Sequence, residues 1–379
     1  MKVAIIGGGA SGISAAISIK KNNPQCDVTI LERFDRIGKK LLATGNGKCN
    51  IGNLNISPTY YNESKLTSTI INKMPIESYT TYLKELGIYL YSDSEGRIYP
   101  YSNSSKTVLD ILLRNIEKHN IKVITNFNVI NLTKEKNVFK LESDDKKALY
   151  FDKVIFSVGS SSQTKEVSAL KLLEKYGHTV KDFTPKLVPI KVKEKVKDIS
   201  GLRFKVNAKL FVEEKLVFSE DGEVLFKDEG IGGIVILNLS RHIVENKKNV
   251  ISLNLINNIN FDLDDYLKTN KMLSKEELLE GIVNKSMAHK LAKVPQRSIK
   301  ELLTDFRLTV ISDYGLNQSQ VSRGGVSVNE IDFDTFESTI IPGAFVIGEA
   351  LDVDGACGGF NLYFAISCGA ILGKNLFTN

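Results

Sequence analysis

The chain has 379 residues, of which 42% are hydrophobic and 25% are charged, as in an ordinary globular protein. At about 150 residues per domain, this length predicts two or three domains. Such a chain can bury a large core without disulfides or a structural metal. The net charge of +6 is small and spread along the chain, so it suits an anionic cofactor but gives no reason to expect nucleic-acid binding. The four cysteines contain no CxxC pair, and no apolar run reaches the ~18 residues of a membrane span, so we expect a cytoplasmic protein with no metal and no membrane contact.

The first thirty residues predict a strand, a tight turn, a helix and a second strand. Residues 3–6 form a short apolar run typical of a buried strand. A glycine-rich turn follows at residues 7–12, and residues 13–20 have the pattern of a helix. Residues 28–32 then predict the second strand. This is the setting that a dinucleotide-binding fingerprint requires.

The turn itself has the pattern Gly7-x-Gly9-x-x-Gly12. In such a motif the first glycine permits the sharp turn, the second lets the backbone approach a pyrophosphate, and the third lets the helix pack closely on the strand. Glu32 ends the second predicted strand, where a carboxylate can accept hydrogen bonds from the ribose hydroxyls of an adenosine. The alternative is a glycine turn in an ordinary α/β protein, with Glu32 solvated at the end of its strand.

A long polar segment follows at residues 34–59. Loops of this length with so little periodicity are commonly functional. Lys39 and Lys40 can neutralise a pyrophosphate, and the glycines at 45 and 47 let backbone amides reach a planar ring. A surface loop with solvated lysines is the competing interpretation.

The remaining elements alternate between helix and strand patterns. Residues 65–87 and 106–120 predict helices, and 122–124, 128–133, 138–143 and 154–158 predict strands. From 187 to 256 short alternating segments indicate antiparallel β-structure, followed by helical periodicity over 262–306 and a return of the β-pattern at 324–328. Residues 344–349 predict a buried strand, and 361–376 predict the last helix.

A second glycine-rich loop joins that strand to that helix at residues 348–361. A loop at a helix N-terminus can hold another segment of the same extended cofactor. The loop also contains the carboxylates Glu349, Asp352 and Asp354. They take part in the functional site, or they cap the helix. For Arg323, which precedes Gly324-Gly325, two roles are open: it faces the flavin or an anionic substrate, or it forms a surface salt bridge.

Taken together, these motifs resemble those of the BaiN/YhiN-type FAD-dependent oxidoreductases. The matching parts are the turn at 7–12 with Glu32, the segment 38–50 and the motifs at 342–343, 348–355 and 358–362. This family is also described as HI-type flavoproteins or the aminoacetone oxidase family. The resemblance covers essentially the whole chain and implies an α/β fold, with a Rossmann-like FAD-binding domain built from both chain ends, an inserted β-barrel-like domain and a small helical domain. We expect the FAD-binding domain at residues 1–186 and 340–379, the β-barrel-like domain at 187–258 and 308–339, and the helical domain at 259–307.

The motifs and the resemblance define the candidate cofactor-binding residues, although no pattern assigns a catalytic residue. These candidates are Gly7, Gly9, Ala10, Ser11, Gly12, Glu32, Arg33, Lys40, Leu41, Thr44, Gly45, Gly47, Cys49, Asn50, Val129, Gly159, Gly348, Glu349, Asp352, Gly358, Gly359, Phe360, Asn361 and Leu362. The sequence departs from the family pattern at residues 227–234, where members often carry a Thr-His or Thr-Glu pair followed by Gly-Ile-Ser-Gly-Pro. If this segment helps to shape the substrate site, substrate choice cannot be carried over from relatives.

The leading functional hypothesis is hydride transfer between FAD and a small organic substrate, most simply by an NAD(P)H-dependent reductase of an unsaturated or conjugated compound. An amine oxidase that uses oxygen is the alternative within this class. The sequence has no second complete GxGxxG setting, so NAD(P)H would enter the substrate site only transiently. A non-catalytic or RNA-modifying flavoprotein is the hypothesis from a functional class other than small-molecule oxidoreductases. Its best support is the run of Lys and Arg residues at 186–205, although Glu194 and Asp198 interrupt that run. The oligomeric state is not predicted.

Overall fold

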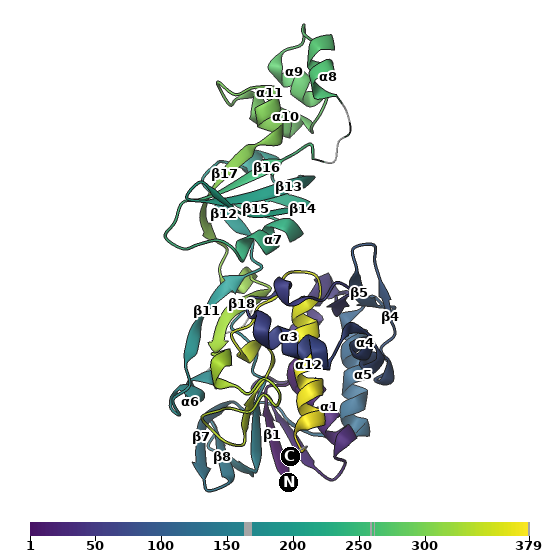
Figure 1. The fold of residues 1–379 in the computed structure, drawn as a ribbon, viewed down its shortest axis with the longest axis vertical. Helices are drawn as coiled ribbons and strands as arrows, with labels where there is room; N and C mark the ends of the chain where they lie inside the picture. The colour runs from purple at the N-terminus through teal and green to yellow at the C-terminus, as the bar shows by residue number, and fades with distance from the viewer. Residues whose placement is uncertain (163–168, 258–259, 261, 378–379) are drawn as a thin grey trace. The chain divides into compact units, whose positions relative to one another are not determined.

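The computed structural model describes residues 1–162, 169–257, 260 and 262–377. The chain divides into two units, one formed by Met1–Thr184 together with Val321–Asn379 and the other by Pro185–Gln320 (Figure 1). The first unit therefore contains both chain ends. The finer three-part division predicted from the sequence stays a proposal.

A parallel sheet forms the centre of the first unit. Its strands follow the order β19-β10-β1-β2-β6, so the first strand of the chain lies in the middle. In register, Ile5 of β1 lies between Ile155 of β10 and Ile30 of β2. Short runs of β-branched residues suit this position because a parallel sheet is covered on both faces. The strands are β1 (Lys2–Ile6), β2 (Asp27–Leu31), β6 (Lys122–Ile124), β10 (Lys153–Phe156) and β19 (Ala344–Val346).

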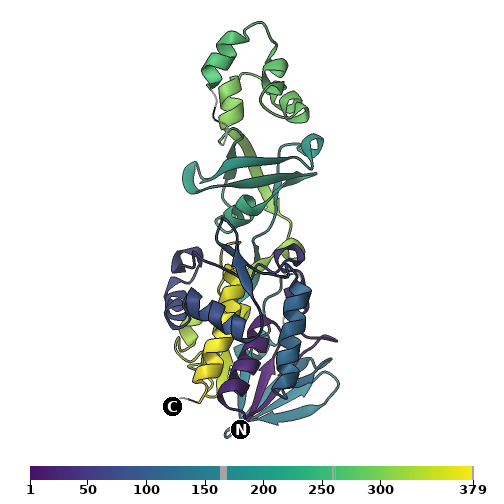
Figure 2. The same ribbon diagram turned by 90° about the vertical axis from the view of Figure 1, so that its right-hand side faces the viewer.

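Three helices pack beside one another along this sheet. Helix α1 (Ala10–Asn22) lies between α12 (Phe360–Asn375) and α5 (Ser105–Lys118), as both views show (Figures 1 and 2). Ser14 and Ser18 of α1 donate from Oγ to the carbonyl oxygens of Ile366 and Ala370 of α12, each at 2.8 Å. These hydrogen bonds between helices require the two backbones to come very close.

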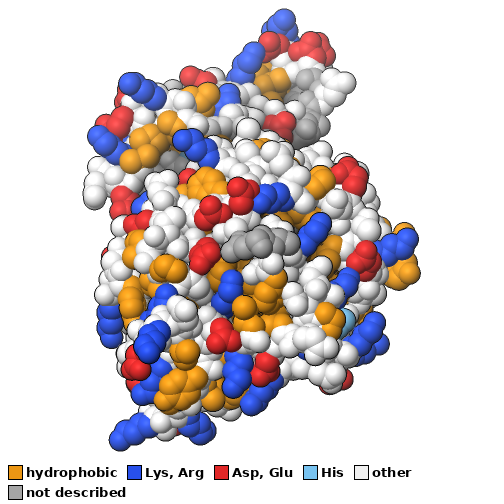
Figure 3. Space-filling view, turned by 60° about the horizontal axis from the view of Figure 1, so that its bottom comes forward, with side chains coloured by type: hydrophobic (Ala, Val, Ile, Leu, Met, Phe, Trp, Pro, Cys, Tyr) orange, Lys and Arg blue, Asp and Glu red, His pale blue; other side chains and the backbone are white. Residues whose placement is uncertain are grey.

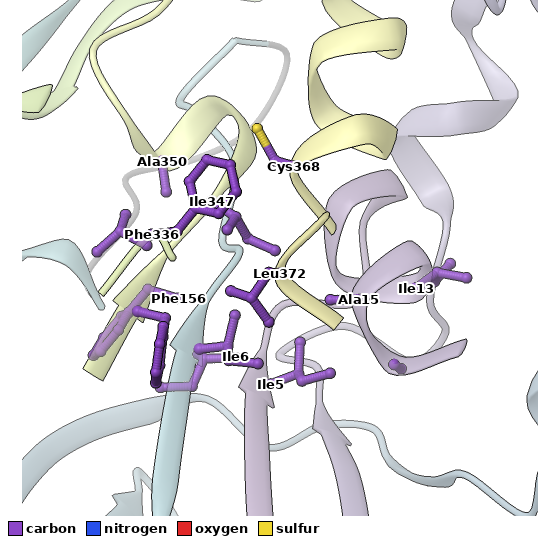
Figure 4. Packing of buried hydrophobic residues seen from close by; sticks show 14 of the residues in the cluster. Ile5, Ile6, Ile13, Ala15, Phe156, Phe336, Ile347, Ala350, Cys368 and Leu372 are labelled. Carbon is purple, nitrogen blue, oxygen red and sulfur yellow. The ribbon is translucent and has the colours of Figure 1, made fainter. Parts of the chain in front are cut away.

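The hydrophobic core lies between the sheet and these helices (Figure 4). Ile5, Phe156 and Leu372 are completely buried there, and they come from the first strand, the middle of the chain and the last helix. Phe336 and Ile347 extend the cluster and are also completely buried. Burying each such side chain contributes roughly 1.5–3 kcal/mol, so the two chain ends stabilise one shared core.

Smaller elements surround this core. The sequence predicted one helix over residues 65–87, but the structure forms two, because Pro75 lacks the N–H that a continuous helix would need. The smaller elements of this unit are α2 (Lys39–Leu42), β3 (Gly52–Asn53), α3 (Ser64–Lys73), α4 (Ile76–Glu85), β4 (Leu90–Ser92), β5 (Arg97–Pro100), β7 (Val129–Glu135), β8 (Val138–Ser143), β9 (Ala148–Phe151), α6 (Leu170–Glu174), β11 (Val180–Lys186) and β18 (Val321–Val326).

The second unit is a closed barrel of strands with a group of short helices. Its strand order is β12-β15-β14-β13-β16-β17. The predicted fold class is thereby confirmed: a Rossmann-like parallel sheet, a barrel and helices. The elements are β12 (Ile190–Val192), β13 (Arg203–Val212), β14 (Lys215–Lys227), β15 (Gly230–Gly232), α7 (Ile234–Ser240), β16 (Asn249–Asn254), α8 (Leu263–Thr269), α9 (Lys275–Glu280), α10 (Lys285–Ala292), α11 (Ile299–Thr304) and β17 (Phe306–Asp313).

The segment that departs from the family pattern lies in this barrel. Gly230 is required because a Cβ there would lie 1.9 Å from the carbonyl oxygen of Ile190. Lys227 places its Nζ 4.8 Å from the centre of the Tyr314 ring.

Among the described residues, no helix combines the length and apolar character needed to span a bilayer.

The contact between α1 and α12 gives the first testable prediction. A Cβ on Gly369 would lie 2.3 Å from the carbonyl oxygen of Ser11 and 2.7 Å from the amide nitrogen of Ala15. Because both are backbone atoms, Gly369→Ala should push the helices apart and lower the free energy of unfolding by about 1–3 kcal/mol, in spite of the ~1 kcal/mol gain in helix propensity. Urea unfolding measures this difference. Lys374→Ala, at an exposed position of the same helix, is the control, and equal or greater stability of Gly369→Ala would contradict the prediction.

Candidate functional site

The glycine turn between β1 and α1 is constrained by backbone contacts on one side and is open on the other. A Cβ on Gly7, whose φ is +104°, would lie 2.6 Å from the carbonyl oxygen of Ser157. A Cβ on Gly12 would lie 2.2 Å from the carbonyl oxygen of Gly7. At Gly9, in contrast, no atom lies within 4 Å of the Cβ position. The turn therefore leaves space at the residue where the motif needs a ligand to approach.

The first turn of α1 is suited to a phosphate group. Gly9 is its N-cap residue and has no side chain that could cap the helix, and the first turn contains no acidic residue. Its amides and the positive end of the helix dipole are thus available to an anion. Ala10 and the buried Ser11 begin this turn.

Glu32 lies immediately after β2, which ends one residue earlier than the sequence predicted. Its side chain is buried, with Oε2 accepting from Gly8 N at 2.8 Å and Oε1 accepting from Phe34 N at 2.9 Å. The carboxylate is therefore joined directly to the glycine turn and is not the solvated strand end that was the alternative. A carboxylate has about four acceptor sites, so two remain for ribose hydroxyls.

Two further candidates lie at this end of the site. The Arg33 guanidinium stacks 4.7 Å from the centre of the Phe34 ring, and burial lowers its pKa while Glu32 opposes the shift. Val129 is buried at the start of β7, two residues after Phe127, whose N–H donates to the carbonyl oxygen of Glu32. Cofactor binding by Arg33 and Val129 stays a proposal.

Lys40 links two of the predicted stretches to the serines that follow β10. Its Nζ donates to Glu349 Oε2 at 2.6 Å, to Ser162 Oγ at 2.6 Å and to Ser160 Oγ at 3.1 Å. Gly159 lies beside this cluster, because a Cβ there would be 4.0 Å from the same Glu349 oxygen. The solvated-lysine alternative therefore does not hold for Lys40.

Lys39, in contrast, pairs with Asp35 at 2.5 Å on the surface. The sequence did not single out Ser160 and Ser162 as site residues. Their only signal was their position directly after a buried strand and a glycine.

The segment 44–50 is a tightly folded loop. Gly45 and Gly47 both have positive φ, and the Cβ position of Gly47 has no atom within 4 Å, so the backbone is again open to a ligand there. Thr44 is held by its Oγ1, which donates to the carbonyl oxygen of the buried Leu41 at 2.6 Å. Cys49 is completely buried, and burial raises the pKa of its thiol to about 11.

The loop from Gly348 to α12 packs directly against the two preceding motifs. A Cβ on Gly348 would lie 2.6 Å from Ser11 Oγ, and a Cβ on Gly359 would lie 2.1 Å from the carbonyl oxygen of Gly52. Asn50 joins the same contact: with its amide oriented to satisfy both atoms, its Oδ1 accepts from Gly359 N at 3.3 Å. The motif at the end of the chain is thus in contact with both motifs at its start.

Within this last loop the candidates serve different purposes. Asn361 accepts from Gly355 N at 2.8 Å and donates to the Gly355 and Ala356 carbonyl oxygens at 3.0 and 3.1 Å, so its amide holds the loop together. The buried Asp352 accepts from Lys181 Nζ at 2.7 Å and from Gly324 N at 2.9 Å.

The remaining candidates of this loop lie around the start of α12. Phe360 stacks on Tyr60 at a centroid distance of 4.3 Å, Gly358 has φ +122°, and Leu362 is partly buried against the core.

The glycine turn, the segment around Asn50 and the loop that begins at Gly348 therefore meet at the carboxyl end of the parallel sheet, and they form the candidate cofactor site. Open backbone at Gly9 and Gly47 and the uncapped start of α1 fit an extended dinucleotide, with Glu32 next to one end of the turn. In open α/β sheets this edge is where ligands bind. Arg323, whose role the sequence leaves open, contacts the buried Asp354 beside the same loop.

Comparison with known proteins agrees with this geometry. Residues 1–375 match the family described as HI0933-like protein Rossmann domain. The chain belongs to this family. It is an FAD-dependent oxidoreductase, and the predicted resemblance, cofactor and enzyme class are confirmed.

Two curated relatives of this HI0933-like protein have matching lengths. It is 28% identical over 407 residues to the 3-dehydro-bile acid delta(4,6)-reductase of Clostridium scindens, with 98% of each chain covered. It is 24% identical over 390 residues to the ribosomal RNA dihydrouridine synthase of Escherichia coli, with 96% of this chain and 94% of the relative covered.

Solved structures share the fold at low sequence identity. The FrdA chain of Escherichia coli quinol fumarate reductase aligns with a TM-score of 0.53 and 12% identity, covering 99% of this chain and 70% of the other. The 3-ketosteroid-delta4-(5alpha)-dehydrogenase of Rhodococcus jostii RHA1 aligns with a TM-score of 0.51 and 13% identity, covering 98% and 95%.

Glu32 gives a prediction about cofactor affinity. Glu32→Gln keeps the size of the side chain but removes its charge and one of the acceptors that bind Gly8 N and Phe34 N. We expect FAD binding to weaken by about 1.5–3 kcal/mol, the range for hydrogen bonds to charged groups. The fluorescence of the flavin that is released on dilution measures the loss of affinity. Glu85→Gln, at an exposed ion pair with Lys21, is the control, and equal flavin retention in both variants would refute the assignment.

Cys49 gives a prediction about reactivity. Because its pKa is raised to about 11, the thiol remains protonated at pH 8, and the reactive thiolate forms only in strong alkali. Iodoacetamide at pH 8 should leave Cys49 unmodified in the folded holoenzyme, and should modify it fully in urea, as peptide mass spectrometry can show. Rapid modification of Cys49 in the native protein would mean that its environment stabilises the thiolate.

Proposed function

We propose that this protein uses NAD(P)H to reduce a carbon–carbon double bond conjugated to a carbonyl group in a small organic molecule. The observation that carries this proposal is the match, over 98% of both chains, to a relative named as a reductase of a 3-oxo steroid with conjugated double bonds. The relatives named dihydrouridine synthase also have names that describe saturation of a ring double bond next to a carbonyl. The shared chemistry is therefore more general than either substrate.

In the overall reaction, NAD(P)H is oxidised to NAD(P)⁺, and the hydride equivalent that it loses adds to the β-carbon of the substrate, while a proton adds to the α-carbon. Bound FAD supplies the two-electron carrier between the nicotinamide and the substrate. Because the sequence contains one complete GxGxxG setting, NAD(P)H and the substrate would use the same space in turn. A reaction supplied by NAD(P)H also agrees with a cytoplasmic location.

Residues of this chain would bind and orient the cofactor. The amides of the first turn of α1 would hold the pyrophosphate, Glu32 the ribose, and the loop at Gly358–Gly359 the flavin ring. The N-cap of α12 is Gly359, and the first turn of α12 contains no acidic residue. Its positive end is thus suited to the negative charge that a flavin gains on reduction.

Reduction of uridine in RNA is the second candidate, because two relatives carry that name at 24% and 22% identity. The basic run predicted from the sequence gives it little support, since Lys191 pairs with Glu229 at 2.9 Å and Arg203 pairs with Glu223. On the face in Figure 3, Lys and Arg side chains are interspersed with Asp and Glu. A small-molecule substrate is therefore the better-supported proposal.

The test is to reduce the holoenzyme anaerobically with NADPH or NADH and then to offer each class of electron acceptor separately. The acceptors are a 3-oxo-Δ4,6 bile acid, a ribosomal RNA transcript and oxygen; aminoacetone is offered separately to the oxidised enzyme. We expect rapid reoxidation by the bile acid with one double bond reduced for each NAD(P)H consumed. Salt should have little effect on that rate, whereas RNA binding would show a steep salt dependence.

The alternatives predict other outcomes. Reduction of the flavin by aminoacetone, followed by fast reoxidation in air, would favour the amine oxidase. Reoxidation by RNA but not by the conjugated ketone would favour the RNA-modifying function. Failure of every conjugated ketone tested to reoxidise the enzyme would contradict the proposal.

A further inference from the structure

Arg323 forms an unusual ion pair beside the loop that begins α12. Its Nε donates to Asp354 Oδ1 at 2.5 Å and its Nη2 donates to Asp354 Oδ2 at 3.2 Å. The Asp354 side chain is fully buried, whereas 34% of the Arg323 side chain is exposed. The pair thus has a buried acidic side and an open basic side.

This pair is tied to the glycine loop by further contacts. Asp354 N donates to Asn62 Oδ1 at 2.7 Å, and the next residue, Gly355, is held by Asn361. On the arginine side, a Cβ on Gly325 would lie 2.5 Å from the carbonyl oxygen of Ala350, so β18 packs directly on the start of the loop. The guanidinium is therefore fixed to the same loop, residues 348–361, that contains Gly358 and Gly359, which we assign to the flavin ring.

One nitrogen of Arg323 remains available for a ligand. A guanidinium carries N–H donors on three nitrogens, and Asp354 uses two of them. Nη1 forms no hydrogen bond with any residue that the structure describes. The bidentate contact fixes the plane of the guanidinium, so the N–H groups of Nη1 have a set direction before any substrate binds.

The charge of the pair indicates what kind of oxygen Nη1 would bind. The Arg323 cation is neutralised by Asp354, and the adjacent Lys181 is neutralised by Asp352 at 2.7 Å. Glu63 completes this neighbourhood, and burial, together with repulsion from Asp352, raises its pKa. Such surroundings carry no excess positive charge that would attract a dicarboxylate, so binding depends on the directed Nη1 donor. They suit an oxygen that is neutral in the bound substrate and becomes negative during the reaction.

We propose that Arg323 Nη1 donates a hydrogen bond to the carbonyl oxygen of the substrate. When hydride adds to the β-carbon, the electron pair of the double bond moves toward that oxygen, and Arg323 stabilises the resulting enolate. Asp354 is the positioning residue that orients Arg323. This inference rests on the proposed reduction of a conjugated carbonyl compound, and it selects ketones over dicarboxylates as substrates.

The inference can be tested by a binding measurement that needs no turnover. 4-Chlorophenol at pH 10 is a planar oxyanion that resembles an enolate, and its binding to the oxidised holoenzyme can be followed by the change in flavin absorbance. We expect Arg323→Gln to raise its Kd at least tenfold, and Arg323→Lys to raise it less. Arg203→Gln, which breaks an exposed Arg–Glu pair in the barrel unit, should bind as the wild type does.

A second variant guards against misfolding. Arg323→Gln leaves the Asp354 carboxylate buried without its cation, which destabilises the folded protein. The double variant R323Q/D354N removes both charges and retains hydrogen-bonding side chains of similar size. If it keeps its FAD and its melting temperature but loses phenolate binding, the inference is supported. Wild-type Kd in this double variant, or no phenolate binding by the wild type, overturns it.

The measurement also separates this inference from the proposed function. If phenolate binding depends on Arg323 but no conjugated ketone is reduced, the oxyanion site stands and the proposed reaction fails. If ketones are reduced and Arg323→Gln neither weakens phenolate binding nor slows reoxidation by the ketone, the reaction stands and the role of Arg323 is wrong.

Discussion

The close contact between α1 and α12 is the constraint on which the rest of the structure depends. It brings the first and the last helices of the chain together without side chains between their backbones at Gly369 and Gly373. Because each helix follows a strand of the parallel sheet, the contact also aligns the two glycine loops that precede these helices. Gly348 consequently packs on Ser11, and one site is formed from both ends of the chain. The barrel unit is inserted between these ends without interrupting them.

Local patterns in the sequence were sufficient to predict this arrangement in outline. A glycine turn with this spacing, set between a buried strand and a helix, is a specific signal of a dinucleotide site. The structure shows why two of its glycines cannot be replaced: the Cβ positions at Gly7 and Gly12 are occupied by backbone atoms or by Ser157. The loop before α12 is required for the same reason at Gly359. Glycines are informative because their necessity is steric and local, so they can be recognised before the fold is known.

The long-range ion pairs could not be predicted in this way. Lys40 and Glu349 are 309 residues apart, and nothing in either local pattern states that they meet. The contacts of Asp352 and Asn361 could not be predicted for a related reason: both lie in the loop before α12, and the folded chain brings their side chains to Gly324 and Gly355. The pairing of Arg323 with a fully buried aspartate also depends on packing that only the folded chain reveals.

The central claim is that the glycine loops from both chain ends bind a single FAD molecule. The most direct measurement is a crystal structure of the yellow holoprotein at a resolution that defines the flavin. The account predicts the pyrophosphate against the first turn of α1 at Gly9, the adenosine ribose at Glu32, and the flavin ring at Gly358 and Gly359. A dinucleotide bound elsewhere, or a flavin ring remote from the start of α12, would contradict it.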